Sequence, residues 1–199
     1  HMTCRKPGGC GHEFCWICMK DWKTHKACNA LEENQTQNEA GHQSELRRFA
    51  HFYERFLAHQ RAEQYAATTH TTRMRNLAAL LAEVHNLKVH DFCFLTEGVA
   101  QVRDSRRFLK WTYAHGFFTT FTADQRQLFE FHQAQLEGTL ERLSDLLENH
   151  NFETYFSPET ESYVPFYNVR QQAMSLTGVV GKFFAHLQEA IEQDTLFTV

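Results

Sequence analysis

The sequence predicts a mainly α protein, in which a four-helix antiparallel bundle follows a small N-terminal zinc-binding domain. Five of the six cysteines lie within the first 28 residues. No proline occurs between Pro7 and Pro158, and an interior proline destabilises a helix by about 3 kcal/mol. Four apolar stripes at helical spacing follow the cysteines. With 199 residues, 42% of them hydrophobic, the chain can form one core and a small metal-stapled appendage.

One complete set of zinc ligands is present in the segment "CWICMKDWKTHKAC". Structural zinc takes four Cys or His ligands in a tetrahedron, and a C-x2-C pair lets two thiolates reach one ion from a tight turn. Cys15 and Cys18 form such a pair. His25 and Cys28 can supply the other two ligands, so these four residues predict one zinc site.

Cys4 and Cys10 make only half of a second site. A disulfide framework would need an oxidising compartment, and five clustered cysteines with a distant Cys93 do not pair neatly. A second alternative is that both are ordinary reduced thiols, with His12 or His1 completing a distorted site. The simpler interpretation is that two further ligands precede residue 1, so that the chain starts within a zinc domain.

We expect a zinc-binding domain at residues 1–30, a polar linker at 31–43 and a helical domain at 44–199.

Composition limits the function classes. The formal charge of -4 argues against a general nucleic-acid binder, and no run of about 18 apolar residues is present to cross a membrane. Without an apolar signal segment, the expected location is the cytoplasm, with the nucleus as an alternative. The sequence lacks a Gly-rich phosphate loop and a G-x-S-x-G motif.

The first two helices are predicted from apolar spacing. The first begins near Ser44, a plausible cap, and continues toward Val84 as a long spine. Its expected buried face comprises Leu46, Phe49, Tyr53, Phe56 and Leu57. The second helix runs from about Val89 to Gly116. Its expected buried stripe comprises Phe92, Leu95, Val99, Val102, Leu109 and Tyr113.

The last two helices carry clear start signals. In "TADQ", Thr122 can cap the third helix while Gln125 reaches back to complete a capping box. Its stripe comprises Leu128, His132, Leu136, Leu140, Leu143 and Leu147. Pro165 suits the first turn of the fourth helix. That stripe comprises Val169, Leu176, Val180, Phe183, Phe184, Leu187 and Ile191.

These residues resemble a known family. The Cys/His block, with its C-x4-C-W-I-C run, resembles the end of the second RING-like, catalytic domain of RING-between-RING ubiquitin ligases. The helical region after this block resembles the helical domain of their Ariadne branch. Two segments carry that second likeness, "SRRFLKWTYAHGFF" for the second helix and "QLFEFHQAQLEGTLERLSDLLE" for the third.

The resemblance implies a cysteine thioester mechanism. In the family, ubiquitin passes from a conjugating enzyme to a cysteine and then to a lysine amine. The family pattern is Cys-Asn-His-Met, so the nucleophile would lie two residues before His1, and His1 would match the catalytic histidine. A base near neutral pKa can take the proton from the attacking amine. The alternative is that His1 and Met2 are a cloning remnant.

The resemblance also implies the metal ligands. Cys4 and Cys10 resemble the second ligand pair of the first zinc, whose first pair would precede the nucleophile. Cys15, Cys18, His25 and Cys28 resemble the full set of the second zinc. Only two residues separate His25 from Cys28, several fewer than in the family, which weakens the case for Cys28.

A regulatory face is implied as well. The family's helical domain covers the catalytic cysteine and holds the ligase inactive until a partner releases it. Tyr65, Glu130 and Glu141 fall on positions that resemble the covering face. Glu130 and Glu141 are about three helical turns apart, so both can point the same way. An acidic face would suit the zinc domain, whose first 28 residues hold five basic and two acidic side chains.

The sequence therefore predicts the C-terminal part of an Ariadne-type ubiquitin-protein ligase with a restraining helical domain and zinc as cofactor. The implied partners are ubiquitin, a ubiquitin-conjugating enzyme and a neddylated cullin-RING ligase, with no nucleic acid and no membrane. The alternative from another class is a zinc-capped helical adaptor that binds proteins without chemistry.

Overall fold

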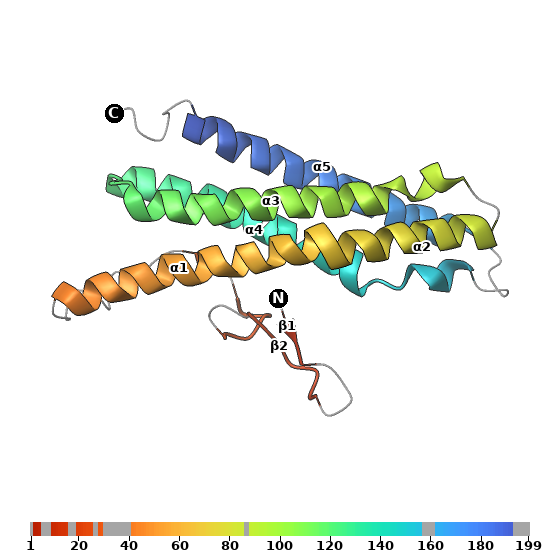
Figure 1. The fold of residues 1–199 in the computed structure, drawn as a ribbon, viewed down its shortest axis with the longest axis horizontal. Coiled ribbons are helices and arrows are strands. Elements are labelled where there is room, and N and C mark those ends of the chain that lie inside the picture. Colours follow the sequence, from red (N-terminus) through yellow and green to blue (C-terminus); the bar gives the residue numbers. More distant parts are fainter. Residues whose placement is uncertain are drawn as a thin grey trace.

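The computed structural model is helical over most of its length (Figure 1). His1, Cys18 and the predicted linker up to residue 40 lie outside the described residues. From Gly41 onward the described chain is almost entirely helix, which confirms the mainly α fold class. The structure describes residues 2–4, 9–15, 19–25, 28–29, 41–85, 88–156 and 162–192.

One continuous helix forms the spine of the fold. Helix α1 (Gly41–Tyr65) passes through the π-helical turn η2 (Ala66–His70) into α2 (Thr71–Val84). The helix thus begins at Gly41, three residues before the predicted cap Ser44. A π-helical turn is wider than an α-helical one, so it shifts which side of the helix faces the bundle.

Three further long helices run alternately in opposite directions (Figure 1). They are α3 (Cys93–Phe118), α4 (Ala123–Asn149) and α5 (Val164–Glu192), with the short 3-10 turns η3 (Val89–Phe92) and η4 (Phe152–Phe156) before α3 and after α4. Helix α1 packs mainly on α3, and α5 packs on α3 and α4. None of the helices described is long and apolar enough to cross a membrane.

The predicted helix starts of α4 and α5 are confirmed. Thr122 accepts a hydrogen bond from the Gln125 amide at 3.3 Å, and the Gln125 side chain accepts one from the Thr122 amide at 2.9 Å. This reciprocal capping box satisfies two amides that the first turn cannot pair. Pro165 lies in the first turn of α5, where its missing amide proton is not needed.

An apolar core occupies the space between α2, α3, α4 and α5. The predicted stripe of α3 is buried, and most of the stripes of α4 and α5 lie in or against this core. Aromatic rings gather at one end, where Phe92 packs against Phe156 and Phe166 with ring centres 5.9 and 5.5 Å apart. The fully buried large residues of the core are Phe92, Phe152, Phe166, Met74, Leu95, Leu109, Leu136, Leu140, Leu143, Leu147 and Leu187.

The buried face predicted for the first helix is wrong for Leu46, Phe49 and Tyr53, whereas Phe56 and Leu57 are half-buried. Leu46 is 67% exposed, and Phe49 and Tyr53 stack on each other at the surface. Leu128, the first residue of the α4 stripe, is exposed too. Helix α1 turns Arg55 and His59 toward the bundle, while Phe52 and Phe56 contact Tyr113 and Trp111 of α3.

Candidate metal centre and its contacts with the helices

A small hairpin carries the first two cysteines beside α1 (Figure 1). Strands β1 (Met2–Thr3) and β2 (Glu13–Phe14) pair antiparallel. Between them, the Cys4 amide donates to the His12 carbonyl at 2.9 Å, and the Gly11 amide donates to the Cys4 carbonyl at 2.8 Å. Gly11 has a φ of 76°, a left-handed conformation that glycine adopts without strain.

This turn brings the side chains of Cys4 and Cys10 together. Two hydrogen bonds lower the pKa of the exposed Cys10 thiol: the larger effect comes from the backbone of His12 and the smaller from the Cys4 side chain. The thiolate is the metal-ligating form of cysteine. The pair therefore has the chemistry of two zinc ligands, and its membership of a second site stays a prediction.

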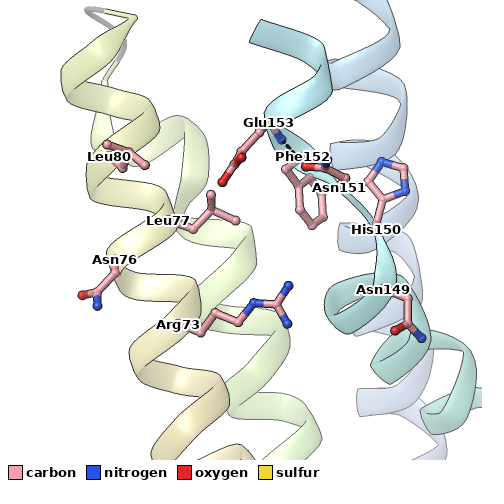
Figure 2. Close-up of a pocket in the computed structure, with 9 residues that line it drawn as sticks. All are labelled: Arg73, Asn76, Leu77, Leu80, Asn149, His150, Asn151, Phe152 and Glu153. Atoms are coloured by element: carbon pink, nitrogen blue, oxygen red, sulfur yellow. Dashed lines mark hydrogen bonds between the residues drawn. The ribbon is translucent and has the colours of Figure 1, made fainter. Parts of the chain in front are cut away.

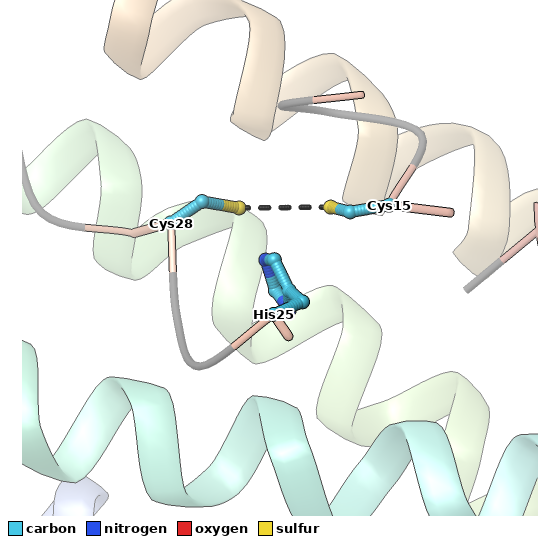
Figure 3. Close-up of side chains that lie close together, drawn as sticks. All are labelled: Cys15, His25 and Cys28. Carbon is cyan, nitrogen blue, oxygen red and sulfur yellow. Dashed lines mark hydrogen bonds between the residues drawn. The ribbon is translucent and has the colours of Figure 1, made fainter. Parts of the chain in front are cut away.

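Three predicted ligands converge in space, as Figure 3 shows. The ligand atoms of Cys15, His25 and Cys28 all lie within 4.8 Å of one another. The two sulfur atoms are 3.7 Å apart, far longer than the roughly 2.05 Å of a disulfide. Two thiolates at about 2.3 Å from one tetrahedral zinc lie ~3.8 Å apart, so this spacing fits a shared ion.

The histidine of this cluster supports the same conclusion. Nε2 of His25 is buried and has no hydrogen-bond partner in the described part of the chain. A buried polar atom without a partner is costly unless something satisfies it, and a metal ion would. The ring is held by stacking on Trp22, with centres 5.2 Å apart. The donor set of two thiolates and one imidazole is typical of zinc.

Local backbone geometry positions Cys15. Its amide donates to the Lys20 carbonyl at 2.9 Å, and its carbonyl accepts from the Met19 amide at 2.7 Å. Met19 adopts a left-handed φ of 59° to close this turn. Cys18, the predicted fourth ligand, lies outside the described residues.

Cys28 and Asn29, which we call the docking segment, are held by helix α1. Arg55 donates to the Cys28 carbonyl through Nε at 2.9 Å and also through Nη2. His51 donates from Nε2 to the Asn29 carbonyl at 2.8 Å. Burial and the neighbouring Arg55 lower the pKa of His51 to about 4, so at neutral pH its ring is uncharged and Nε2 carries the donated proton.

The side chain of Asn29 reaches helix α4. Asn29 is only 4% exposed. Its Nδ2 donates to the main-chain carbonyl of Glu130 at 2.7 Å and to Oε1 of Gln133 at 3.2 Å. Gln133 in turn donates to the Thr112 hydroxyl on α3 at 2.8 Å. The docking segment is thereby bonded directly to α1 and α4, and Gln133 links it to Thr112 of α3.

Further buried and half-buried polar side chains lie between α1, α3 and α4. Glu137 on α4 accepts from the Tyr113 hydroxyl at 2.5 Å and pairs with Nε2 of His59 at 3.0 Å. Burial, then the Glu137 carboxylate, raises the pKa of Tyr113 well above its usual value. We call this group the polar seam; its members are His59, Glu63, Thr112, Tyr113, Gln133 and Glu137.

The far end of the polar seam joins α1 to α3. Glu63 accepts from Arg107 at 2.9 Å and from Lys110 at 2.6 Å. Burial alone would raise the pKa of Glu63, but these two cations outweigh it and hold that pKa below its ordinary value. Each charge of the seam therefore has an opposite charge or a hydrogen bond beside it.

The structure places the three residues of the predicted regulatory face at different positions. Glu130 touches the docking segment through its carbonyl. Glu141 pairs with Arg106 of α3 at 2.7 Å. Tyr65, at the end of α1, is 39% exposed and stacks on His70 with ring centres 5.7 Å apart. Their regulatory role stays a prediction.

A hollow lies away from the cysteines, between α2 and the segment after α4 (Figure 2). Its volume is about 390 Å³. Arg73 and Leu77 line one wall, and Phe152 and Glu153 line the other. Its one histidine, His150, is engaged with Tyr155 at 2.8 Å. The hollow offers shape and charge for binding, but lacks the convergent groups of the metal centre.

The residues that hold the docking segment were not predicted. His51, Arg55, His59 and Glu63 recur every four residues, which places them on one face of a helix. This stripe of ionisable residues on α1 is the sequence signal that could have indicated a buried polar face. Asn29 comes directly after the last cysteine, but its partner Gln133 lies 104 residues away.

Two protein families match the chain. The family described as Ariadne domain matches residues 47–199, which is more than half of the chain. The family described as IBR domain matches residues 1–38 and so includes the candidate metal centre.

Curated relatives match over most of the chain. A probable E3 ubiquitin-protein ligase, ARI9 of Arabidopsis thaliana, is 34% identical over 201 residues, covering 96% of this chain and 35% of that protein. The protein rbrA of Dictyostelium discoideum is 27% identical over 203 residues, which cover 96% of this chain and 38% of that protein. The protein dbl4 of Schizosaccharomyces pombe is 31% identical over 156 residues, which cover 74% of this chain and 30% of that protein. The chain spans about a third of the length of these relatives.

Proposed function

Given that this chain belongs to the Ariadne family, we propose that it is the restraining part of a RING-between-RING ubiquitin ligase. Such a ligase carries ubiquitin as a cysteine thioester and transfers it to substrate lysines. The relatives ARI9, rbrA and dbl4 are described as E3 ubiquitin-protein ligases. In this proposal, residues 1–30 belong to the catalytic zinc domain and residues 44–199 form the helical regulatory domain.

The proposed metal is zinc. Cys15, His25 and Cys28 would hold it with Cys18, and Cys4 and Cys10 would contribute to a second ion. Zinc in a site of this kind fixes the local fold and takes no part in the transfer. The spacing of the two thiolates and the unpartnered Nε2 of His25 support this assignment.

One observation carries the proposal of restraint: Asn29, next to a metal ligand, is buried between α1 and α4 and bonded to both. A domain anchored in this way is kept from turning freely relative to the helices. By resemblance, His1 would act as the general base for the attacking lysine. Restraint of the domain that carries it would limit access to the transfer site.

The proposed partners are those that this activity requires. Ubiquitin and a ubiquitin-conjugating enzyme would deliver the thioester, and a neddylated cullin-RING ligase would release the helical domain. Release is a population shift, because a partner that binds the released form better draws the equilibrium toward it.

The test measures ubiquitin loading in the full-length protein without an activating partner. Replacing Tyr65, Glu130 or Glu141 with alanine should raise loading several-fold if its side chain holds the restrained form, because a lost contact of about 1–3 kcal/mol removes much of the preference for that form. Glu130→Ala keeps the main-chain carbonyl that binds Asn29, so it tests the carboxylate alone. Glu83→Ala is the control, since Glu83 is exposed on α2 and lies outside the metal centre and the polar seam.

Two outcomes would count against the proposal. Equal loading in all variants and the wild type would remove these residues from the restraint. A complete lack of ubiquitin thioester would favour the alternative, a zinc-capped adaptor without chemistry.

A further inference from the structure

The metal ligand Cys28 is held from outside its own domain. Its carbonyl accepts two hydrogen bonds from Arg55, a residue of α1. The next residue, Asn29, is fixed by His51 of α1 and by Gln133 of α4. Helix residues therefore determine where one side of the metal centre lies.

We propose that α1 and α4 supply positioning residues for the metal centre, so that metal binding and docking of the helices stabilise each other. Arg55, His51 and Gln133 are these residues, and Cys28 is the ligand through which they act. The inference rests on the proposed zinc site. It adds a direct energetic link between that site and the helical domain.

The geometry around Cys28 supports this coupling. Only two residues separate His25 from Cys28. The planar guanidinium of Arg55 grips the carbonyl with two donors, which fixes direction as well as distance. Cys15 and His25, by contrast, are held by turns and stacking within the zinc domain.

Asn29 provides a second constraint. Its carbonyl and its amide group are bonded to different helices, so it cannot rotate without losing one of them. Gln133 is 2% exposed and is itself held by Thr112. A hollow of about 30 Å³ lies beside these residues.

Coupling of this kind has a measurable size and direction. Residues that orient metal ligands typically change metal affinity by about 10–100-fold when they are replaced. By linkage, a change in metal affinity caused by docking equals the change in docking caused by metal. Separating the helices from the zinc domain must therefore break the Asn29 anchor or weaken the metal centre.

The main experiment compares zinc affinities of the whole chain by competition with a chromophoric chelator. Gln133→Ala should weaken zinc binding about tenfold, although Gln133 is no metal ligand. Thr139→Ala is the matched control on the same helix, because Thr139 is also 2% exposed but its described hydrogen bonds, with Gln135 and Arg142, lie within α4. Its zinc affinity should equal that of the wild type. Cobalt absorption should show the same thiolate ligands in each variant.

A double-mutant cycle separates positioning from general destabilisation. In an Asn29→Ala background, Gln133→Ala should cause little further loss of zinc affinity, because the shared link is already gone. An equal loss in both backgrounds would overturn the proposal. If Gln133→Ala does not fold, Arg55→Lys serves instead: it keeps the charge, loses the two-donor grip and should weaken zinc binding several-fold.

The outcomes also distinguish this inference from the zinc site itself. Wild-type protein that is folded but binds no zinc would overturn the proposed metal centre. Wild-type protein that binds zinc, with unchanged affinity in Gln133→Ala and Arg55→Lys, would overturn only the coupling. Zinc removal should also speed amide hydrogen exchange in α1 around Arg55, while exchange around Leu187 in α5 stays unchanged.

Discussion

The apolar core and the polar seam lie in the same bundle but hold helices together by different means. In the core, rings such as Phe92 and Phe166 fill space with no hydrogen bonds to satisfy. In the seam, the buried Tyr113 and His59 are both bonded to the half-buried carboxylate of Glu137. Apolar packing tolerates substitution by similar shapes, whereas a polar network requires specific partners. The seam is therefore the part of the bundle suited to fixing the docking segment in one position.

The difference arises from which helix faces which. Helices α3, α4 and α5 bury aliphatic and aromatic stripes against each other, while α1 buries Arg55, His59 and Glu63. Buried ionisable groups stabilise a fold weakly but strongly penalise the loss of one partner.

The largest effect should come from the apolar core. Phe92 is fully buried and contacts Phe156 and Phe166. Phe92→Ala should lower the free energy of unfolding by about 3–5 kcal/mol, because it removes a large apolar side chain and leaves a cavity. Urea unfolding followed by circular dichroism measures this. A loss below about 1 kcal/mol would mean that this end of the core is loosely packed.

Substitutions in the polar seam should lower the free energy of unfolding by less, and by an amount that depends on which hydrogen-bonding groups are left without a partner. Glu137→Ala leaves the Tyr113 hydroxyl and Nε2 of His59 without their acceptor, and should lower the free energy of unfolding by about 1–3 kcal/mol. Tyr113→Phe leaves Glu137 paired with His59, so its effect should be smaller. Equal effects of the two variants, measured by the same unfolding assay, would contradict a network held by partners.

The core follows from local sequence signals, whereas the seam does not. The stripe of α3 from Phe92 to Tyr113 and the capping box at Thr122 were predicted, because apolar periodicity and cap residues are local signals. The convergence of Cys15, His25 and Cys28 agrees with the ligand spacing.

The seam escaped prediction because its determinants are not local. An ionisable stripe on α1 looks like a solvated face until its partners on α3 and α4 are known. The hydrogen bond from Asn29 to Gln133 joins residues 104 positions apart, and no local pattern around Asn29 or within α4 predicts it. The two-residue spacing before Cys28 argued against that ligand, yet the helices place it beside Cys15.

Acid should weaken the polar contacts of α4 more than the apolar core. Burial opposes the charge of Glu141, but nearby positive charge, chiefly Arg106 at 2.7 Å, outweighs it and holds the pKa of Glu141 below the ordinary 4.5. Since the folded pKa is depressed, this stabilisation is fully present above about pH 4.5 and is lost as the pH falls through the folded pKa.

The matching variant is Glu141→Gln. Between about pH 5 and pH 3, the wild type should lose about 1 kcal/mol of unfolding free energy that this variant does not lose, since its amide cannot be protonated in that range. Unfolding curves at several pH values measure the difference. Parallel pH profiles for the two proteins would show that the Arg106–Glu141 pair contributes nothing.

The smallest effect should come from the outer face of α1. Leu46 is 67% exposed, whereas Leu140 on α4 is fully buried. Leu46→Gln should change the free energy of unfolding by less than about 0.5 kcal/mol, because an exposed side chain has little apolar surface to return to water. Leu140→Ala, measured in the same urea series, should cost about 2–5 kcal/mol. If Leu46→Gln instead costs more than about 1 kcal/mol, the apolar face of α1 is packed after all. The polar residues Arg55 and His59 would then no longer mark the side of α1 that holds the bundle together.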